Sequence, residues 1–147
     1  MMISRIGSDD LSFIVRIEQS INPFPWTFGH FEASFAAGHL GFVLRSPDQK
    51  IIGYCFVSTV LDEAELLLIG VAPEYQYQGL GSRLWVFVQE YLIQQQIKKI
   101  FLEVRVSNTK AISFYKKIGF VEISRRKDYY VGNGVCEDAV VMSLTIF

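Results

Sequence analysis

Two glycines, Gly79 and Gly81, stand between an expected strand and an expected long helix, in the run Q-Y-Q-G-L-G at residues 76–81. A helix start carries unpaired N–H groups and a positive dipole end, so it can hold phosphate, and glycines let the ligand approach the backbone. A dinucleotide-binding motif would need glycine at Leu84, and a P-loop would need lysine at Ser82. A tight turn without a ligand is the alternative for so short a motif.

The cysteines and histidines, which could bind a metal or take part in redox chemistry, are few and far apart in the sequence. Cys55 and Cys136 belong to no CxxC or Cys/His cluster, and His30 and His39 have no neighbouring carboxylate pattern. We therefore expect no metal site and no redox site. Both cysteines are predicted to be buried as small hydrophobic side chains, and both histidines to have surface or packing roles.

The length and composition of the chain predict a single domain covering residues 1–147. The chain is 50% hydrophobic and 20% charged with a formal net charge of −1, which is typical of a globular protein and gives no overall positive surface for nucleic acid. No apolar run approaches the roughly 20 residues of a membrane span, and the first residues do not resemble a signal peptide. We expect a soluble cytoplasmic protein without direct nucleic-acid or membrane partners, and the oligomeric state is left open.

Hydrophobic periodicity predicts the elements that must position the glycine loop. Strands are expected over residues 2–6, 40–44, 51–60, 65–71, 100–106, 120–125 and 139–147, with a loop at 132–134. Helices are expected after the caps Asp9, Thr27 and Asn108 and from Leu80 onward. The crossover between residues 65 and 106 implies one parallel strand pair. We therefore predict an α+β fold with a mixed, mostly antiparallel central sheet of about seven strands, flanked by about four helices.

Several separate motifs resemble one family. Residues 66–81 and the helix after them resemble the acetyl-CoA motif of the GNAT superfamily of N-acetyltransferases, Gln/Arg-x-x-Gly-x-Gly/Ala, and the element order fits that GNAT fold from end to end. The runs F-P-W at 24–26, L-E-V-R at 102–105 and I-G-F at 118–120 resemble a group within it, the bacterial RimI-type ribosomal-protein-alanine N-acetyltransferases. The resemblance implies acetyl transfer from acetyl-CoA, without a metal, to the N-terminal alanine of a small-subunit ribosomal protein.

The resemblance assigns acetyl-CoA to the strand around Gly70 and to the glycine loop. In this family the pantetheine arm lies beside that strand like an added strand, at an edge opened by a bulge, for which Gly70 is suited. Asn108 matches an asparagine that contacts CoA, although capping a helix is a sufficient role for it. The residues expected to bind acetyl-CoA are Ile69, Gly70, Val71, Tyr77, Gln78, Gly79, Leu80, Gly81, Ser82 and Asn108.

The resemblance also places Glu103 as general base and Tyr115 as general acid. A peptide α-amine has a pKa of about 7.7–8.0 and must lose a proton before it attacks a thioester, and a carboxylate can take that proton directly or through water. A phenol can then assist expulsion of the CoA thiolate. The alternative interpretations are a solvated surface residue for Glu103 and a core aromatic for Tyr115.

For the acceptor peptide, the expected contacts are Phe24, Trp26 and Tyr130. Acidic residues at 62–63 and 137–138 would attract a cationic N-terminal peptide, although such side chains are more often plain surface. Phe24 and Trp26 could instead fasten the first two helices to the sheet. The family often has a basic residue where Tyr77 stands, and Arg83 is a candidate to compensate for that charge.

The sequence thus favours direct acetyl transfer in a ternary complex, without a covalent acetyl-enzyme. Two alternatives stay open beside it. One is a GNAT enzyme that acts on a small-molecule amine or a lysine side chain. The other is a CoA-binding sensor module that keeps the fold without turnover.

Overall fold

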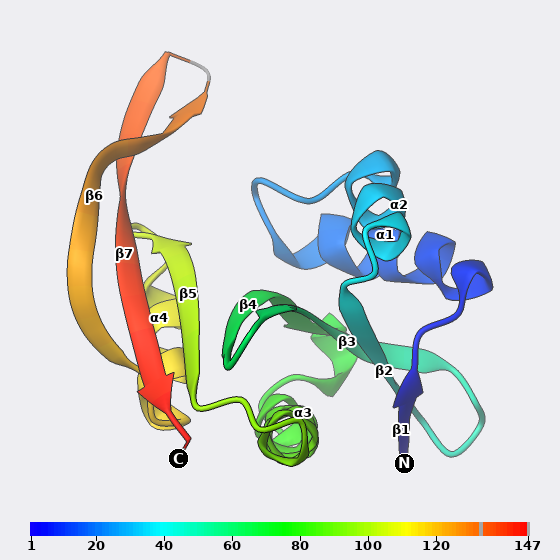
Figure 1. Ribbon diagram of the computed structural model, residues 1–147. Coiled ribbons are helices and arrows are strands. Elements are labelled where there is room, and N and C mark those ends of the chain that lie inside the picture. Colours follow the sequence, from blue (N-terminus) through cyan, green and yellow to red (C-terminus); the bar gives the residue numbers. More distant parts are fainter. Residues whose placement is uncertain (133, 147) are drawn as a thin grey trace.

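A computed structural model describes residues 1–132 and 134–146 of the chain (Figure 1). The strands within them are β1 Met2–Arg5, β2 Leu40–Arg45, β3 Ile51–Val60, β4 Glu63–Val71, β5 Lys99–Arg105, β6 Val121–Gly132 and β7 Val135–Thr145. The α-helices are α1 Leu11–Ile21, α2 Phe28–Ala36, α3 Leu80–Gln94 and α4 Thr109–Lys117, and short 3-10 turns cover Ser8–Asp10 and Pro73–Tyr75. In these described parts, no helix is both long and apolar enough to cross a membrane.

The strands form one sheet in the order β1-β2-β3-β4-β5-β7-β6. Neighbouring strands are antiparallel except β4 and β5, which are parallel. This confirms the predicted α+β class and the crossover. The parallel pairing joins residues 63–65 to residues 99–101 and stops there. Beyond that point β4 and β5 separate, which splits the sheet into an N-terminal and a C-terminal half.

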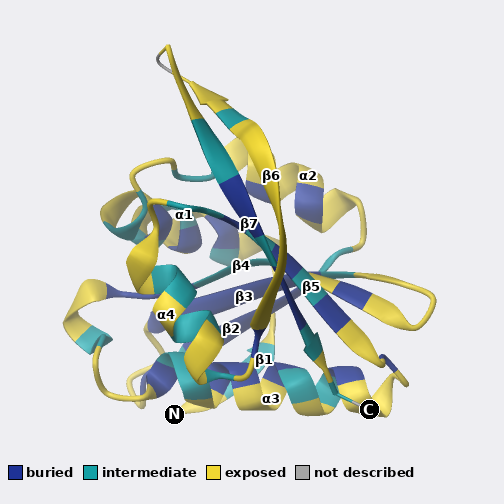
Figure 2. Ribbon diagram, turned by 90° about the vertical axis from the view of Figure 1, so that its left-hand side faces the viewer, coloured by how far each residue is buried: buried dark blue, intermediate teal, exposed yellow. Residues whose placement is uncertain are grey.

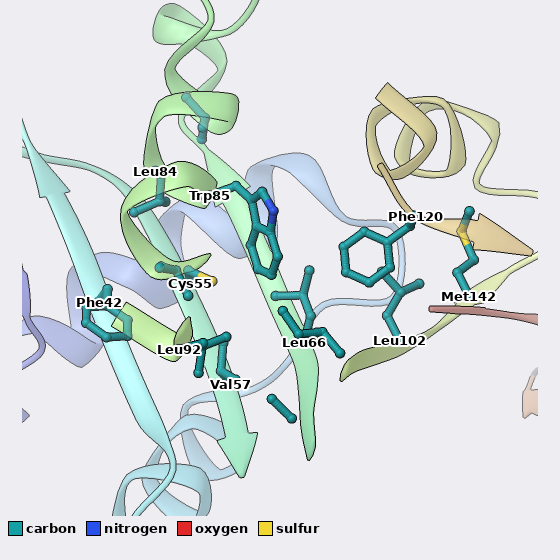
Figure 3. Close-up of a cluster of buried hydrophobic side chains, with 14 of the residues drawn as sticks. Phe42, Cys55, Val57, Leu66, Leu84, Trp85, Leu92, Leu102, Phe120 and Met142 are labelled. Atoms are coloured by element: carbon teal, nitrogen blue, oxygen red, sulfur yellow. The ribbon is translucent and has the colours of Figure 1, made fainter. Parts of the chain in front are cut away.

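Two buried clusters lie on opposite faces of the sheet. On one face α3 packs against both halves, with Trp85 against Phe120 at a ring distance of 5.6 Å (Figure 3). On the other face α1 and α2 bring Ile14 and Phe31 onto Tyr54 of β3. The helices therefore hold the two halves together on one face and cover mainly the N-terminal half on the other.

The side chains of β5 alternate between these two faces as the sequence predicts. Ile100, Leu102 and Val104 are buried in the cluster beneath α3. Glu103 and Arg105 are only partly buried and point to the opposite face, because successive side chains of a strand point in opposite directions. The predicted base therefore lies on the face that α1 and α2 cover farther along the sheet.

The last two strands are longer than predicted. Instead of 120–125 and 139–147, they cover Val121–Gly132 and Val135–Thr145, and their hairpin projects beyond the body of the molecule with mostly exposed residues (Figure 2). A hairpin exposed on both sides has no hydrophobic alternation from which its length could be predicted. The prediction that Cys136 is buried is wrong for the same reason, since it lies exposed on this hairpin. Asn133 of the predicted loop and Phe147 lie outside the described residues.

Two of the three predicted helix caps are confirmed. The side chains of Thr27 and Asn108 accept hydrogen bonds from the N–H groups of His30 and Ala111, both at 3.2 Å. The Asp9 cap is wrong, because a 3-10 turn comes before α1 and Asp10 is the residue that precedes the helix. The Asp10 carboxylate accepts the N–H of Gly7 at 2.8 Å, so it closes that turn instead of capping α1.

Candidate active site

The strand β4 presents a main-chain edge to the split in the sheet. Ala72 donates its N–H toward β3, to the carbonyl oxygen of Ile52 at 2.8 Å. Main-chain groups of a strand alternate in direction, so those of Val71 and Ile69 point the other way, away from β3. Gln76 Nε2 confirms this direction by donating to the Val71 oxygen at 2.9 Å. The N–H groups of Ile69 and Val71 are therefore placed to pair with an extended ligand that enters the split.

Gly70 has a different role from the one its sequence suggested. The register of β3 and β4 shifts at Leu67, so the bulge lies there and not at Gly70. A Cβ atom at Gly70 would lie 2.4 Å from Tyr54 Oη and 2.8 Å from Ile21 Cδ1. Glycine is needed at this position because the Tyr54 ring and α1 pack against its backbone.

The glycine loop forms the N-terminus of α3. Gly79 has φ +76° and ψ 9°, and no side chain caps the helix, so the first-turn N–H groups of Leu80, Gly81 and Ser82 are uncapped by side chains. A Cβ at Gly81 would approach Phe114 to 3.2 Å, so this glycine lets α3 begin close against α4. The arrangement fits a pyrophosphate, because it combines uncapped N–H groups with a positive helix end.

A lysine that sequence reasoning missed stands beside this loop. Lys110 Nζ donates to Gln76 Oε1 at 2.7 Å and lies 5.0 Å from the ring centre of Tyr77. Arg83, the residue expected to compensate for Tyr77, instead lines a hollow with Met1, Phe87 and neighbouring residues. The positive charge at the loop therefore comes from α4.

Glu103 lies in an acidic groove between the two halves of the sheet. Its Oε2 atom is buried and has no hydrogen-bond partner among the described residues, and Arg126 Nε lies 3.7 Å from it. Burial, together with the charge of Glu103, raises the pKa of neighbouring Glu65, and the Glu103 charge raises the pKa of Tyr129. The groove is lined by Ser58, Val60, Glu63, Ala64, Glu65, Phe101, Leu102, Glu103, Arg126 and Val141. Glu103 is thus a carboxylate of this groove whose Oε2 is ion-paired with Arg126 and accepts no hydrogen bond from the described residues.

Tyr115 approaches the split from the opposite face. It sits on α4 and packs against the cluster beneath α3. Burial raises the pKa of its phenol, with smaller contributions from Cys55, Tyr130 and Glu18. A raised pKa keeps the phenol protonated at neutral pH, as a general acid requires.

The three residues predicted for the acceptor divide into two kinds. Trp26 packs on Phe31 and Phe56 at ring distances of 5.2 and 6.1 Å, so it fastens α2 to the sheet. Phe24 and Tyr130 lie on either side of Arg105. Sequence reasoning missed Arg105, although the β5 alternation had put it on the face of Glu103.

Some of the acidic residues at 62–63 and 137–138 that were considered for the acceptor already accept hydrogen bonds within the protein. Glu137 accepts from Arg105 Nη1 at 3.2 Å and from the Ser107 N–H at 2.8 Å. Asp138 accepts the N–H of Asp128 at 2.9 Å. Glu63, by contrast, lines the groove beside Glu103. The carboxylates that line the groove are therefore on β4 and β5.

Comparison with known proteins agrees with this geometry. The model of the acetyltransferase (GNAT) family matches residues 11–120. The chain belongs to the GNAT acetyltransferase family. It is 37% identical over 144 residues to the [ribosomal protein bS18]-alanine N-acetyltransferase of Escherichia coli K12, covering 98% of this chain and 97% of that one. The identity is 38% over 143 residues to the Haemophilus influenzae protein of the same name, covering 97% of each.

The fold comparison points to the same GNAT subgroup. The crystal structure of the ribosomal-protein-S18-alanine N-acetyltransferase from Escherichia coli aligns with a TM-score of 0.89 and 36% identity, covering 99% of this chain and 93% of that chain. This GNAT protein is accordingly a RimI-like N-acetyltransferase. The fold and enzyme class predicted from the sequence are both confirmed.

Proposed function

We propose that this enzyme transfers the acetyl group of acetyl-CoA to the N-terminal α-amine of an alanine-starting ribosomal-protein peptide. The observation that carries the proposal is Glu103, which lines an acidic groove at the split between β4 and β5 and whose Oε2 has Arg126 as an ion-pair partner at 3.7 Å but accepts no hydrogen bond from the described residues. Relatives that match nearly the whole chain are named for this reaction on bS18. A ribosomal acceptor places the reaction in the cytoplasm.

Acetyl-CoA binding rests on the open β4 edge and the start of α3. The N–H groups of Ile69 and Val71 would pair with the pantetheine arm, and those of residues 80–82 would hold the pyrophosphate. Lys110 would add a positive charge beside Tyr77 and Gln78. Asn108 caps α4 through one carboxamide oxygen, which leaves its amide nitrogen for CoA.

Glu103 and Tyr115 divide the proton transfers of the reaction. The acceptor arrives as an ammonium, and Glu103 takes one proton directly or through water. The amine nitrogen then attacks the thioester carbonyl, so a C–N bond forms and the C–S bond breaks. The nitrogen loses its second proton to solvent or base, and the departing CoA sulfur receives a proton from Tyr115. The main-chain N–H groups of β4 are placed to stabilise charge on the carbonyl oxygen.

Direct transfer suits this site better than a covalent acetyl-enzyme. Cys55 is buried, and burial raises the pKa of its thiol, so it stays neutral and unreactive. Cys136 lies on the exposed hairpin. The groove carboxylates Glu63, Glu65 and Glu103 favour a cationic acceptor, such as a basic N-terminal peptide.

Steady-state kinetics with acetyl-CoA and an alanine-starting ribosomal peptide test the proposal. We expect Glu103→Gln to bind acetyl-CoA normally in calorimetry and to lose about 10²–10⁴-fold in kcat. Glu90→Gln on α3 is the matched control and should behave as wild type. If a free polyamine is acetylated and the peptide is not, the enzyme is a small-molecule acetyltransferase. If wild type binds acetyl-CoA and acetylates no amine, the chain is a sensor.

A further inference from the structure

The guanidinium of Arg105 lies between two aromatic rings from distant parts of the chain. Its Cζ is 3.6 Å from the ring centre of Phe24, in the segment between α1 and α2, and 4.3 Å from that of Tyr130 on β6. Cations over ring faces within about 6 Å attract the aromatic quadrupole. One side chain of β5 thus contacts two of the three residues predicted to contact the acceptor.

The orientation of Arg105 is fixed by Glu137 of β7. Arg105 Nη1 lies 3.2 Å from Glu137 Oε2, and the other carboxylate oxygen accepts the Ser107 N–H at 2.8 Å. The two charged side chains are only 22% and 16% exposed. A planar guanidinium can stack on two rings while it donates to a carboxylate, which a lysine ammonium cannot do.

The segment that carries Phe24 is itself held by α1. Its N–H donates to Asn22 Oδ1 at 3.0 Å, and Asn22 Nδ2 donates to the buried carboxylate of Glu18 at 3.2 Å. Glu18 also accepts the Trp26 N–H at 2.9 Å. The segment between α1 and α2 is therefore anchored to α1, and Arg105 connects it to the C-terminal half.

The β6 side of the contact depends on an irregularity in the hairpin. Arg126 pairs with Ala139 and Tyr130 pairs with Glu137, so residues 127–129 lie opposite the single residue Asp138. Asp128 adopts φ +49° and donates its N–H to Asp138. Such bulges redirect the side chains that follow, and here Tyr130 is directed at Arg105.

We propose that Arg105 is a positioning residue that sets the width of the acceptor groove beside Glu103. The proposal rests on the proposed function, because it assumes that the acceptor reaches Glu103 alongside the contact of Phe24, Arg105 and Tyr130. Arg105 is two residues from Glu103 on the same face of β5, so the contact spans the split next to the base. Loss of the contact frees the two walls to separate, while the acetyl-CoA residues on β4 and α3 keep their places.

The test is Arg105→Lys, which keeps the charge and loses the double stack. We expect the acceptor KM to rise about tenfold, with kcat and the acetyl-CoA KM within about twofold of wild type. Discrimination between alanine-starting and leucine-starting peptides should also fall. Arg125→Lys, which changes an exposed arginine paired with Glu122 on β6, is the matched control and should change none of these quantities.

A double-mutant cycle in the acceptor KM distinguishes coupling between Phe24 and Arg105 from independent effects of the two substitutions. If Phe24 and Arg105 act as one unit, Phe24→Leu with Arg105→Lys raises the acceptor KM by less than the product of the single effects. Multiplicative effects overturn the proposal, as does an unchanged acceptor KM in Arg105→Lys.

Amide hydrogen exchange tests the contact without any substrate. In Arg105→Lys, exchange should speed up at Asn22, Phe24 and Trp26 and at residues 127–132, and it should stay unchanged in α3. Unchanged exchange at both walls overturns the proposal even if the enzyme prefers another amine. A different result is that wild type acetylates no peptide while exchange is still faster in Arg105→Lys. That result refutes the proposed function and the acceptor part of this inference, and it verifies the contact itself.

Discussion

The hydroxyl of Tyr54 donates a 2.8 Å hydrogen bond to Glu18 Oε1 in the interior of the molecule. Both side chains are 1% exposed or less, and burial raises the pKa of the Tyr54 phenol. The other Glu18 oxygen binds the segment that carries Trp26. A single buried carboxylate therefore connects β3, α1 and the segment beside the candidate acceptor groove.

The space for this contact is provided by Gly70, and Gly70→Ala should destabilise the protein. The new Cβ would lie 2.4 Å from Tyr54 Oη, and relief of such overpacking typically costs about 1–3 kcal/mol. Chemical denaturation measures the loss. Gly132→Ala is the control, because its Cβ meets nothing within 4 Å and its φ is not positive. Equal stability of the two variants would contradict this role.

Gly79→Ala separates backbone strain from cofactor binding when it is compared with Gly38→Ala. Both glycines have positive φ, +76° and +79°, and a Cβ at either meets nothing within 4 Å. Each substitution should cost about 1–2 kcal/mol of stability, since L-residues avoid this conformation. Only Gly79→Ala should raise the acetyl-CoA KM, because Gly38 follows α2. A similar KM change in both variants would show that the loop is not the pyrophosphate site.

The succession of elements along the chain, the crossover and the alternation of β5 follow from hydrophobic periodicity, and all three were predicted. The contacts that shape the site join residues that are distant in sequence, so periodicity does not indicate them. Phe24, Arg105 and Tyr130 are far apart in sequence, and nothing in the pattern around any one of them indicates the other two. The reason for glycine at position 70 is likewise a ring from β3, which no local pattern contains.

The exposed hairpin of β6 and β7 is a second feature whose extent could not be predicted from the sequence. Secondary structure is predictable where one face is buried, because burial imposes a period. Residues 125–131 are polar or exposed on both sides, so they resemble a loop although they belong to β6. The bulge opposite Asp138 depends on a pairing register that only the folded hairpin reveals.

Tyr115→Phe should lower kcat and leave acetyl-CoA binding intact, with a loss of up to about 10²–10⁴-fold. The wild-type pH profile gives a second check. Burial raises the pKa of the Tyr115 phenol above its usual value of about 10, so the proton of the general acid is present throughout the neutral range. We expect no loss of kcat assignable to Tyr115 below pH 10. An alkaline decline near pH 8 that disappears in Tyr115→Phe would contradict the raised pKa, and an unchanged kcat in Tyr115→Phe would refute its role as the acid.

Glu137 should make the stability of the protein depend on pH. Hydrogen bonds from Ser107 and Arg105 lower its pKa in the folded state. A carboxyl group with a lowered folded pKa stabilises the fold above its unfolded pKa of about 4.3, and this contribution is lost as the pH falls through the folded value. Thermal denaturation should therefore find Glu137→Gln less stable than wild type at pH 7, with the difference shrinking as the pH falls below the unfolded pKa of about 4.3 and through the lowered folded pKa. A constant difference would contradict this linkage.

The acceptor that we propose is a peptide α-amine. The most direct measurement is tandem mass spectrometry of the product made from acetyl-CoA and a basic peptide with an N-terminal alanine and an internal lysine. We predict one acetyl group, located on the alanine nitrogen, and none when Glu103→Gln replaces wild type under matched conditions. Acetyl groups on the lysine with a free N-terminus would contradict the account.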